Sequence, residues 1–489
     1  KETAEILQRE PDYLPLKEYD GIVQGNALRM EWGSLLNVAN AQMLPIAKSN
    51  SPLGHREPGT ENWKLGNGTG NTTTLATFSY IMGNPPFVGA RNKSNDQAAD
   101  MEAVFGKSWK CLGNLDYVTC WYKKAADYVL GTTEYTENTE KKSSVYSVSS
   151  VVKNPFTKCA FVSTNSICQG EAVALLWKPL FESGIEIDFA WRTFRWDNEA
   201  QAKAHVHCVI IGFGVRGDNL TQSSQSPQSG RIETSRTSRT SREAKRIYDG
   251  DKVIEAANIN GYLMDAPNAW IEGRKSPICD VPPLVFGSMP NDGGYLSDWG
   301  DEQKDAICSA NPEAKSLFRR FLGASEFINN RTRWCLWLKN ASPAIIRSIP
   351  QVKDAVANVY KMRSESSRIG TRKLAEVPTL FGEIRQPESG NYLLVPCHSS
   401  ENRNYIPLGY ISSDVICSNA NLMIPSATLY HFGVLTSSVH MAWMRTVCGR
   451  LKSDYRYSAN IVYNNFPWPE VENVANVQVL PITNTNSQL

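Results

Sequence analysis

The residues best suited to chemistry are the run Ile81-Met82-Gly83-Asn84-Pro85-Pro86-Phe87. The Asn84 side-chain oxygen and the Pro85 carbonyl oxygen can both accept hydrogen bonds from one exocyclic amino group. Two acceptors aimed at one amino group draw its lone pair out of conjugation with the ring, toward an attacking geometry. The Phe87 ring offers a face on which a base can stack, a contact worth about 1–3 kcal/mol. Taken alone, these residues could also form an ordinary proline-rich turn.

The flanking sequence places this run at the end of a strand. Residues 75–82 are predicted as a strand, and Pro85 followed by Pro86 can continue neither a sheet ladder nor a helix. We therefore expect a rigid loop at the carboxyl end of a strand. In open α/β sheets, ligands bind at the carboxyl ends of the strands.

The sequence on either side predicts the other elements of such a sheet. Residues 22–27 are predicted as a strand that ends in a polar turn, and residues 194–196 as part of a polar loop. Further strands are predicted at residues 158–164, 185–190 and 205–213, and helices at residues 95–105, 115–130 and 171–182. This order is typical of the α/β class, with a parallel doubly wound sheet closed by an antiparallel pair.

Asn84-Pro85-Pro86-Phe87, followed by Val88-Gly89-Ala90, resembles the catalytic motif of S-adenosylmethionine-dependent methyltransferases that modify the amino group of adenine in DNA. More narrowly, the chain resembles the methyltransferase and target-recognition part of the MmeI-type restriction-modification enzymes. The resemblance covers most of the chain apart from two insertions. The segments that carry it are Gly25-Asn26-Ala27-Leu28-Arg29-Met30-Glu31-Trp32 and residues 115–118, 161–166, 194–196, 205–213, 431–437 and 464–469.

The resemblance implies a Rossmann-like class I methyltransferase sheet, incomplete at its N-terminal side, followed by an α+β target-recognition domain. Residues 1–265 would form the methyltransferase domain, residues 266–435 the DNA target-recognition domain, and residues 436–489 a C-terminal helical segment and tail. Residues 48–74 and 214–247 are rich in small polar residues and are expected as flexible insertions in the first domain.

The resemblance also implies roles for the residues of the motif. Asn84 and Pro85 would orient the target amine, and Pro86 would keep their loop rigid. Phe87 and Phe194 would sandwich an adenine turned out of the DNA stack, with Trp196 as the reserve for Phe194.

The same resemblance implies an S-adenosylmethionine site formed by Asn26, Ala27, Asn84 and Asp116. Asn26 would accept a hydrogen bond from the amino group of the cofactor's adenine. A plain strand-end turn explains Asn26 equally well, and a helix cap explains Asp116. The Gly-rich turn that cradles the cofactor's methionine in such enzymes does not occur between Lys1 and Asn84. The chain is therefore expected to be part of a longer polypeptide, whose upstream part would be a partner.

Basic and aromatic residues interleave after residue 269, which fits contacts to a nucleic-acid backbone. Arg333 and Arg363 are the expected phosphate contacts there. Glu401 and Arg403 lie two positions apart after a predicted strand, so their side chains point the same way. A carboxylate can accept from a cytosine amino group, and a guanidinium can bridge a guanine edge. Charged helix faces and a surface salt bridge are the alternatives.

Composition restricts the other classes of function. The net charge is only +2, so a DNA-binding interpretation depends on local basic clusters. Eleven cysteines without a Cys-x-x-Cys pair indicate reduced thiols in a cytoplasmic protein. No apolar run is long enough to span a membrane. His205 and His207 share one face of a strand, but no acidic residue adjoins them, so no metal site is expected.

The activity expected from these residues is methyl transfer from S-adenosylmethionine to the exocyclic amine of adenine in a specific double-stranded DNA site. The base must leave the stack, which costs a few kcal/mol. A methyltransferase acting on a protein glutamine is one alternative, and Phe rather than Tyr at position 87 argues against it. A DNA-binding module without catalysis is the other.

Overall fold

A computed structural model of the chain describes residues 23–33, 35, 78–131, 156–196, 206–216 and 244–470. The chain forms two compact units. The first contains residues 1–163, 179–192 and 209–259, and the second contains residues 164–178, 193–208 and 260–489. Each unit mixes helices with strands. None of the helices in these described stretches is both long enough and apolar enough to cross a membrane.

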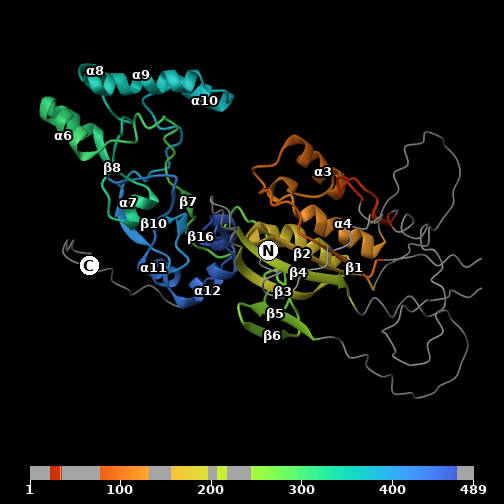
Figure 1. The fold of residues 1–489 in the computed structure, drawn as a ribbon. Coiled ribbons are helices and arrows are strands. Elements are labelled where there is room, and N and C mark those ends of the chain that lie inside the picture. Colours follow the sequence, from red (N-terminus) through yellow and green to blue (C-terminus); the bar gives the residue numbers. More distant parts are fainter. Residues whose placement is uncertain are drawn as a thin grey trace, which may run out of the picture. The chain divides into compact units, whose positions relative to one another are not determined.

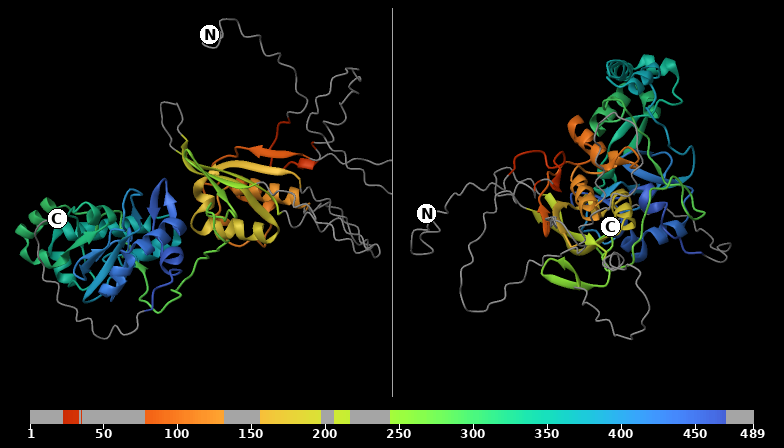
Figure 2. Two further views of the ribbon diagram at one scale, coloured as in Figure 1. Left: turned by 90° about the horizontal axis from the view of Figure 1, so that it is seen from below. Right: turned by 90° about the vertical axis from the view of Figure 1, so that its right-hand side faces the viewer.

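A six-stranded sheet with the strand order β1-β2-β4-β3-β5-β6 organises the first unit (Figure 1). Strands β1 and β2 pair in parallel, as do β3 and β5, and the hairpin β5–β6 forms an antiparallel edge (Figure 2). The strands are β1 (Tyr80–Gly83), β2 (Lys158–Thr164), β3 (Ile185–Trp196), β4 (Val206–Val215), β5 (Lys245–Asp249) and β6 (Lys252–Ala256).

Strand β2 was predicted at its observed bounds, because the apolar run of residues 159–162 between polar ends is typical of a short buried strand. Strand β3 continues past the predicted end at Ala190, so Phe194 and Trp196 lie on a strand and not in a loop. The predicted insertion of residues 214–247 is too long at both ends, because Val215 ends β4 and Lys245 begins β5. Residues 48–74 and 217–243 lie outside the described residues.

Two helices, α3 (Asn95–Phe105) and α4 (Thr119–Leu130), cover the sheet, with α4 between α3 and the strands (Figure 1). Ser94 caps α3, because its hydroxyl accepts from the main-chain nitrogen of Gln97 while the Gln97 side chain accepts from the nitrogen of Ser94. The apolar face of α4 packs on the sheet through Tyr122, whose ring lies 5.3 Å from Phe161 of β2.

Helix α4 begins at Thr119, four residues after the predicted start at Leu115, because Leu115 has an extended backbone (φ −92°, ψ 142°) that ends the preceding 3-10 turn of residues 112–114. The helix predicted at residues 171–182 is present. It contains a π-helical turn at Val173–Trp177 and ends in α5 (Lys178–Glu182).

Three small sheets form the strand part of the second unit, with the orders β12-β10-β14-β7, β13-β8-β9 and β11-β16-β15. Their strands are β7 (Val285–Phe286), β8 (Phe318–Leu322), β9 (Trp334–Leu336), β10 (Asn391–Pro396), β11 (His398–Ser399), β12 (Gly409–Ser412), β13 (Ile416–Cys417), β14 (Asn421–Pro425), β15 (Gly449–Leu451) and β16 (Asp454–Arg456).

The described residues of this unit form three hydrophobic cores, of which the smallest joins β8, β10, β13 and β14 and the two larger ones include helices. One of the larger cores joins β10 and β14 to the C-terminal helices, and the other joins β8 and β9 to the helices of residues 301–364. The helices are α6 (Asp301–Ala310), α7 (Ala324–Ile328), α8 (Pro343–Ser348), α9 (Pro350–Ser364), α10 (Ile369–Lys373), α11 (Leu429–Leu435) and α12 (Ser438–Val447).

Candidate active site

A cavity of about 400 Å³ opens beside the carboxyl end of β1. Four of the predicted site residues line it: Ala27, Asn84, Pro85 and Pro86. Most of the remaining wall is apolar and aromatic, and is formed by Trp32, Leu35, Phe78, Tyr80, Ile81, Met82, Gly83, Trp121 and Phe161. Small-molecule sites typically have volumes of about 300–1,000 Å³ and combine apolar walls with a few polar groups.

The loop of residues 84–87, which carries the Asn-Pro-Pro-Phe motif, is held in place by contacts of the residues that directly follow it. The main-chain nitrogen of Ala90 donates to Asp116 Oδ1 at 2.7 Å, and the nitrogen of Tyr117 donates to the carbonyl of Val88 at 3.0 Å. Asp116 therefore ties the loop to the segment that precedes α4. Pro85 is buried and Asn84 is exposed, so the amide has access to a ligand while the backbone beside it is fixed.

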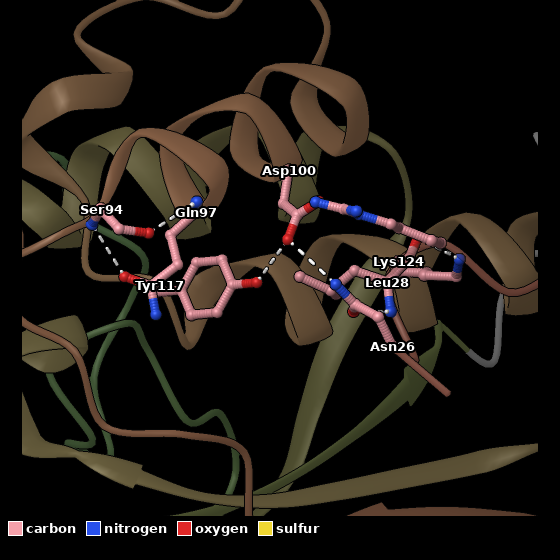
Figure 3. A network of polar contacts seen from close by, with 8 residues as sticks. Asn26, Leu28, Ser94, Gln97, Asp100, Tyr117 and Lys124 are labelled. Atoms are coloured by element: carbon pink, nitrogen blue, oxygen red, sulfur yellow. Dashed lines mark hydrogen bonds and ion pairs between the residues drawn. The ribbon is translucent and has the colours of Figure 1, made fainter. Parts of the chain in front are cut away.

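A buried carboxylate, Asp100 of α3, connects this segment to the loop that carries Asn26 (Figure 3). Asp100 Oδ2 accepts from the Tyr117 hydroxyl at 2.7 Å and from Asn26 Nδ2 at 3.1 Å, and Asp100 Oδ1 accepts from Arg29 Nε at 2.7 Å. Burial raises the pKa of Asp100, but the hydrogen bonds from Arg29, Tyr117 and Asn26 outweigh it and hold the pKa below its usual value.

The side chain of Asn26 already makes two hydrogen bonds within the protein. Its Oδ1 accepts from the main-chain nitrogen of Leu28 at 3.0 Å, while its Nδ2 donates to Asp100. A carbonyl oxygen can accept a second hydrogen bond, so the predicted contact to the cofactor's adenine would use the remaining lone pair of Oδ1.

Lys124 of α4 and Trp32 fix the rest of the loop. Lys124 Nζ donates to the carbonyls of Leu28 and Met30 at 2.8 and 2.6 Å, and burial lowers the pKa of this lysine. Trp32 Nε1 donates to the carbonyl of Ala27 at 2.8 Å. Sequence reasoning missed both Asp100 and Lys124. The available signal for Asp100 was a carboxylate next to Met101 on the buried face of α3.

The second predicted stacking residue, Phe194, lies on β3 with its ring centroid 6.1 Å from that of Trp196. Its pairing with Phe87 around a base stays a prediction. Phe87 itself is half-buried and directly follows the residues that line the cavity.

The predicted phosphate contact by Arg363 is wrong. Its side chain is 0% exposed and donates five hydrogen bonds to main-chain carbonyls, those of Pro290, Asn291, Leu374, Val377 and Leu380. The guanidinium therefore joins the end of α9 to two loops and cannot reach a ligand. The neighbouring basic residues Lys361, Arg368, Arg372 and Lys373 are exposed.

Arg333 is engaged within its own unit. Its guanidinium lies 3.1 Å from Glu326 and stacks 4.7 Å from the ring centroid of Phe321, which leaves the side chain 27% exposed. Its predicted DNA contact stays a prediction.

Glu401 and Arg403 have exposed side chains in the loop after β11. The main chain of this loop is held by two hydrogen bonds, since the nitrogen of Glu401 donates to Asp454 Oδ1 at 3.3 Å and the Tyr455 hydroxyl donates to the carbonyl of Glu401 at 3.3 Å. The two side chains remain candidates for base readout.

The pair His205 and His207 was not expected to bind a metal. His205 lies outside the described residues, and among the described residues no group of three or more His, Cys, Asp or Glu side chains could hold a metal ion.

Two known protein families match this chain, one over its N-terminal part and one over its C-terminal part. The model of the family described as "MmeI, DNA-methyltransferase domain" matches residues 1–225, and that described as "MmeI, target recognition domain" matches residues 265–470. "DNA methyltransferase A" of Bacillus subtilis (strain 168) is 38% identical over 393 residues, which are 80% of this chain and 39% of that protein.

The solved structure of the Type IIL restriction-modification enzyme MmeI in complex with DNA is 37% identical, with a TM-score of 0.72. The match covers 96% of this chain and 52% of the MmeI chain, so this chain spans about half or less of the length of these two proteins. The chain belongs to the MmeI-like family of DNA methyltransferases, as a methyltransferase domain followed by a target recognition domain.

Proposed function

We propose that the chain transfers a methyl group from S-adenosylmethionine to the exocyclic amine of adenine in a specific double-stranded DNA site, within a restriction-modification system. The observation that carries this proposal is the position of Asn84, Pro85 and Pro86 on the wall of a cavity at the carboxyl end of a strand that pairs in parallel with β2. That placement also favours a Rossmann-like class I methyltransferase sheet. A DNA substrate implies a cytoplasmic location.

The cavity suits S-adenosylmethionine in size and in chemistry. Its volume of about 400 Å³ is within the range of small-molecule sites, and the rings of Trp32 and Trp121 give flat apolar walls for an adenine. Ala27, Trp32, Asn84 and Trp121 would hold the cofactor, with Asn26 and Asp116 fixing the two loops that flank them. When bound, S-adenosylmethionine supplies an activated methyl group on a sulfonium.

The chain's own residues would then orient the nucleophile. Asn84 Oδ1 and the Pro85 carbonyl accept the two amino hydrogens of the target adenine, and Phe87 and Phe194 stack on its ring. The amine nitrogen forms a bond to the methyl carbon as the bond from that carbon to sulfur breaks. The proton leaves for solvent after the transfer, so no strong base is needed. Positioning and preorganised acceptors supply most of the acceleration.

DNA binding is assigned to the second unit. Glu401 and Arg403 present exposed side chains for base edges, while four exposed basic residues between the end of α9 and the end of α10 are suited to phosphates. We call these four residues the α9–α10 basic cluster: Lys361, Arg368, Arg372 and Lys373.

The test is transfer of labelled methyl from S-adenosylmethionine into unmethylated duplex DNA of mixed sequence. Asn84→Ala is expected to lower kcat by about 10²–10³-fold, because it removes a preorganised hydrogen-bond partner of the reacting group. Asn92→Ala, at another exposed asparagine downstream of the motif, is the matched control and should keep full activity. Hydrolysis of the product should give label in N6-methyladenine.

Two outcomes would contradict the proposal. Label recovered in cytosine would exclude adenine as the target. DNA binding without any label would leave a recognition module that lacks catalysis.

A further inference from the structure

We infer that Asp100 is a positioning residue that holds the loop of residues 26–32 in the conformation that forms one wall of the cofactor cavity. This inference rests on the proposed function, since it concerns the same cavity. It assigns a role to a side chain that does not itself line the cavity.

Three donors from two other segments converge on this one carboxylate. Asn26 reaches it from the loop, and Tyr117 reaches it from the segment before α4 (Figure 3). Arg29, also in the loop, is the third donor. The Asp100 side chain is 7% exposed, whereas the Arg29 side chain is 61% exposed. The carboxylate is therefore the buried end of the pair, where a loss of partners is most costly.

The loop that Asp100 holds has two residues on the cavity wall. Ala27 and Trp32 both line the cavity, and Trp32 Nε1 donates to the carbonyl of Ala27, so the two move together. Asn26 starts the turn of residues 26–29 that contains Ala27, because its Oδ1 accepts from the nitrogen of Leu28 and its carbonyl accepts from the nitrogen of Arg29. Asp100 fixes Asn26 and Arg29, and through them the backbone that carries Ala27.

Only a carboxylate satisfies this arrangement. An ionised Asp has two acceptor oxygens and no donor, which matches three incoming donors. In Asp100→Asn, the amide nitrogen would face at least one of these donors and the negative charge opposite Arg29 would be lost. The loop would then occupy other conformations for part of the time. The apparent affinity for the cofactor falls by the fraction of chains that keep the competent loop, while the bound state keeps its geometry.

The experiment compares Asp100→Asn with Asp96→Asn, an exposed aspartate one turn earlier on α3. Calorimetric titration of the 489-residue chain with S-adenosylhomocysteine gives Kd, and methyl-transfer kinetics give KM for S-adenosylmethionine and kcat. For Asp100→Asn we expect Kd and KM to rise about tenfold with kcat unchanged within about twofold. For Asp96→Asn we expect all three values to match the parent.

If circular dichroism shows that Asp100→Asn does not fold, Arg29→Gln is the variant to test instead. The Arg29 side chain is largely exposed, so its replacement leaves the core intact. Arg29→Gln removes one of the three donors and should raise Kd about threefold. Unchanged Kd and KM in the folded variants would overturn the inference, as would a fall in kcat with unchanged KM.

Failure of the proposed function has a different signature. A parent chain that binds S-adenosylhomocysteine but methylates no DNA contradicts the proposed reaction, and the Kd comparison still decides the role of Asp100. A parent chain that binds neither cofactor nor product overturns both.

Discussion

At the scale of single residues, His440 shows how burial sets the chemistry of a side chain. The imidazole is fully buried, its Nε2 lies 2.9 Å from the Tyr457 hydroxyl, and its Nδ1 has no hydrogen-bond partner among the described residues. Burial lowers the pKa of His440 to about 4. The folded protein therefore holds this ring neutral at pH values where an exposed histidine is protonated.

This pKa predicts acid sensitivity. The unfolded chain, with a pKa near 6.5, binds a proton that the folded chain excludes, so stability is complete above about pH 6.5 and is lost as the pH falls toward 4. Between pH 7 and pH 5 the loss from this residue should be about 2 kcal/mol. Urea unfolding at both pH values measures it. His440→Gln, which does not titrate there, should have a smaller pH dependence, and an equal dependence in both proteins would contradict the assignment.

At the scale of elements, the pairing of β3 and β4 depends on a glycine. A Cβ at Gly212 of β4 would lie 2.1 Å from the ring of Phe189 on β3, so the ring occupies the space that a side chain would need. Gly212→Ala should destabilise the first unit by about 1–3 kcal/mol, because the ring must leave its position. Thermal unfolding of the variant measures the change.

The control for this prediction is Gly433→Ala in α11, where a Cβ would meet nothing within 4 Å. Alanine is the better helix former there and should be neutral or stabilising.

A double variant tests whether the two positions interact. Combining Gly212→Ala with Phe189→Ala should recover part of the stability that Gly212→Ala loses. Strictly additive effects would show that the two positions do not interact.

The sequence predicted the elements of the first unit better than its polar interior. Strand β2 and helix α3 were predictable because a short apolar run and a helical pattern of side chains are local signals. The extension of β3 to Trp196 was not, because residues 191–196 are mostly exposed and mix polar with aromatic side chains, without a regular apolar face. The buried structural roles of Asp100 and Arg363 were not predicted from the sequence, for the same reason. Each is a charged residue whose partners lie at least 11 positions away along the chain, and nothing in the adjacent sequence distinguishes it from a solvated charge.

At the scale of the whole molecule, the net charge of +2 is too small to attract DNA by itself. Affinity must then come from local concentrations of charge such as the α9–α10 basic cluster. Lys373→Gln should lower the slope of log Kd against log salt concentration by about 0.9, the value for one phosphate contact on duplex DNA. Binding titrations at several salt concentrations measure the slope.

Lys339→Gln is the matched control, because the Lys339 ammonium already pairs with Glu388 at 3.2 Å. It should leave the slope unchanged. If Lys373→Gln and Lys339→Gln gave the same slope as the parent, phosphate contacts would have to be sought outside the cluster.

The five hydrogen bonds of Arg363 have a consequence for how the sequence can diverge. Each bond ends on a main-chain carbonyl, and a carbonyl is chemically the same whichever residue carries it. The hydrogen bonds of Arg363 therefore do not restrict which residues occupy its five acceptor positions in relatives, namely 290, 291, 374, 377 and 380. Position 363 is restricted, because no other side chain offers five donors in one plane. Family members should therefore keep the arginine while the loops it joins lose all recognisable similarity.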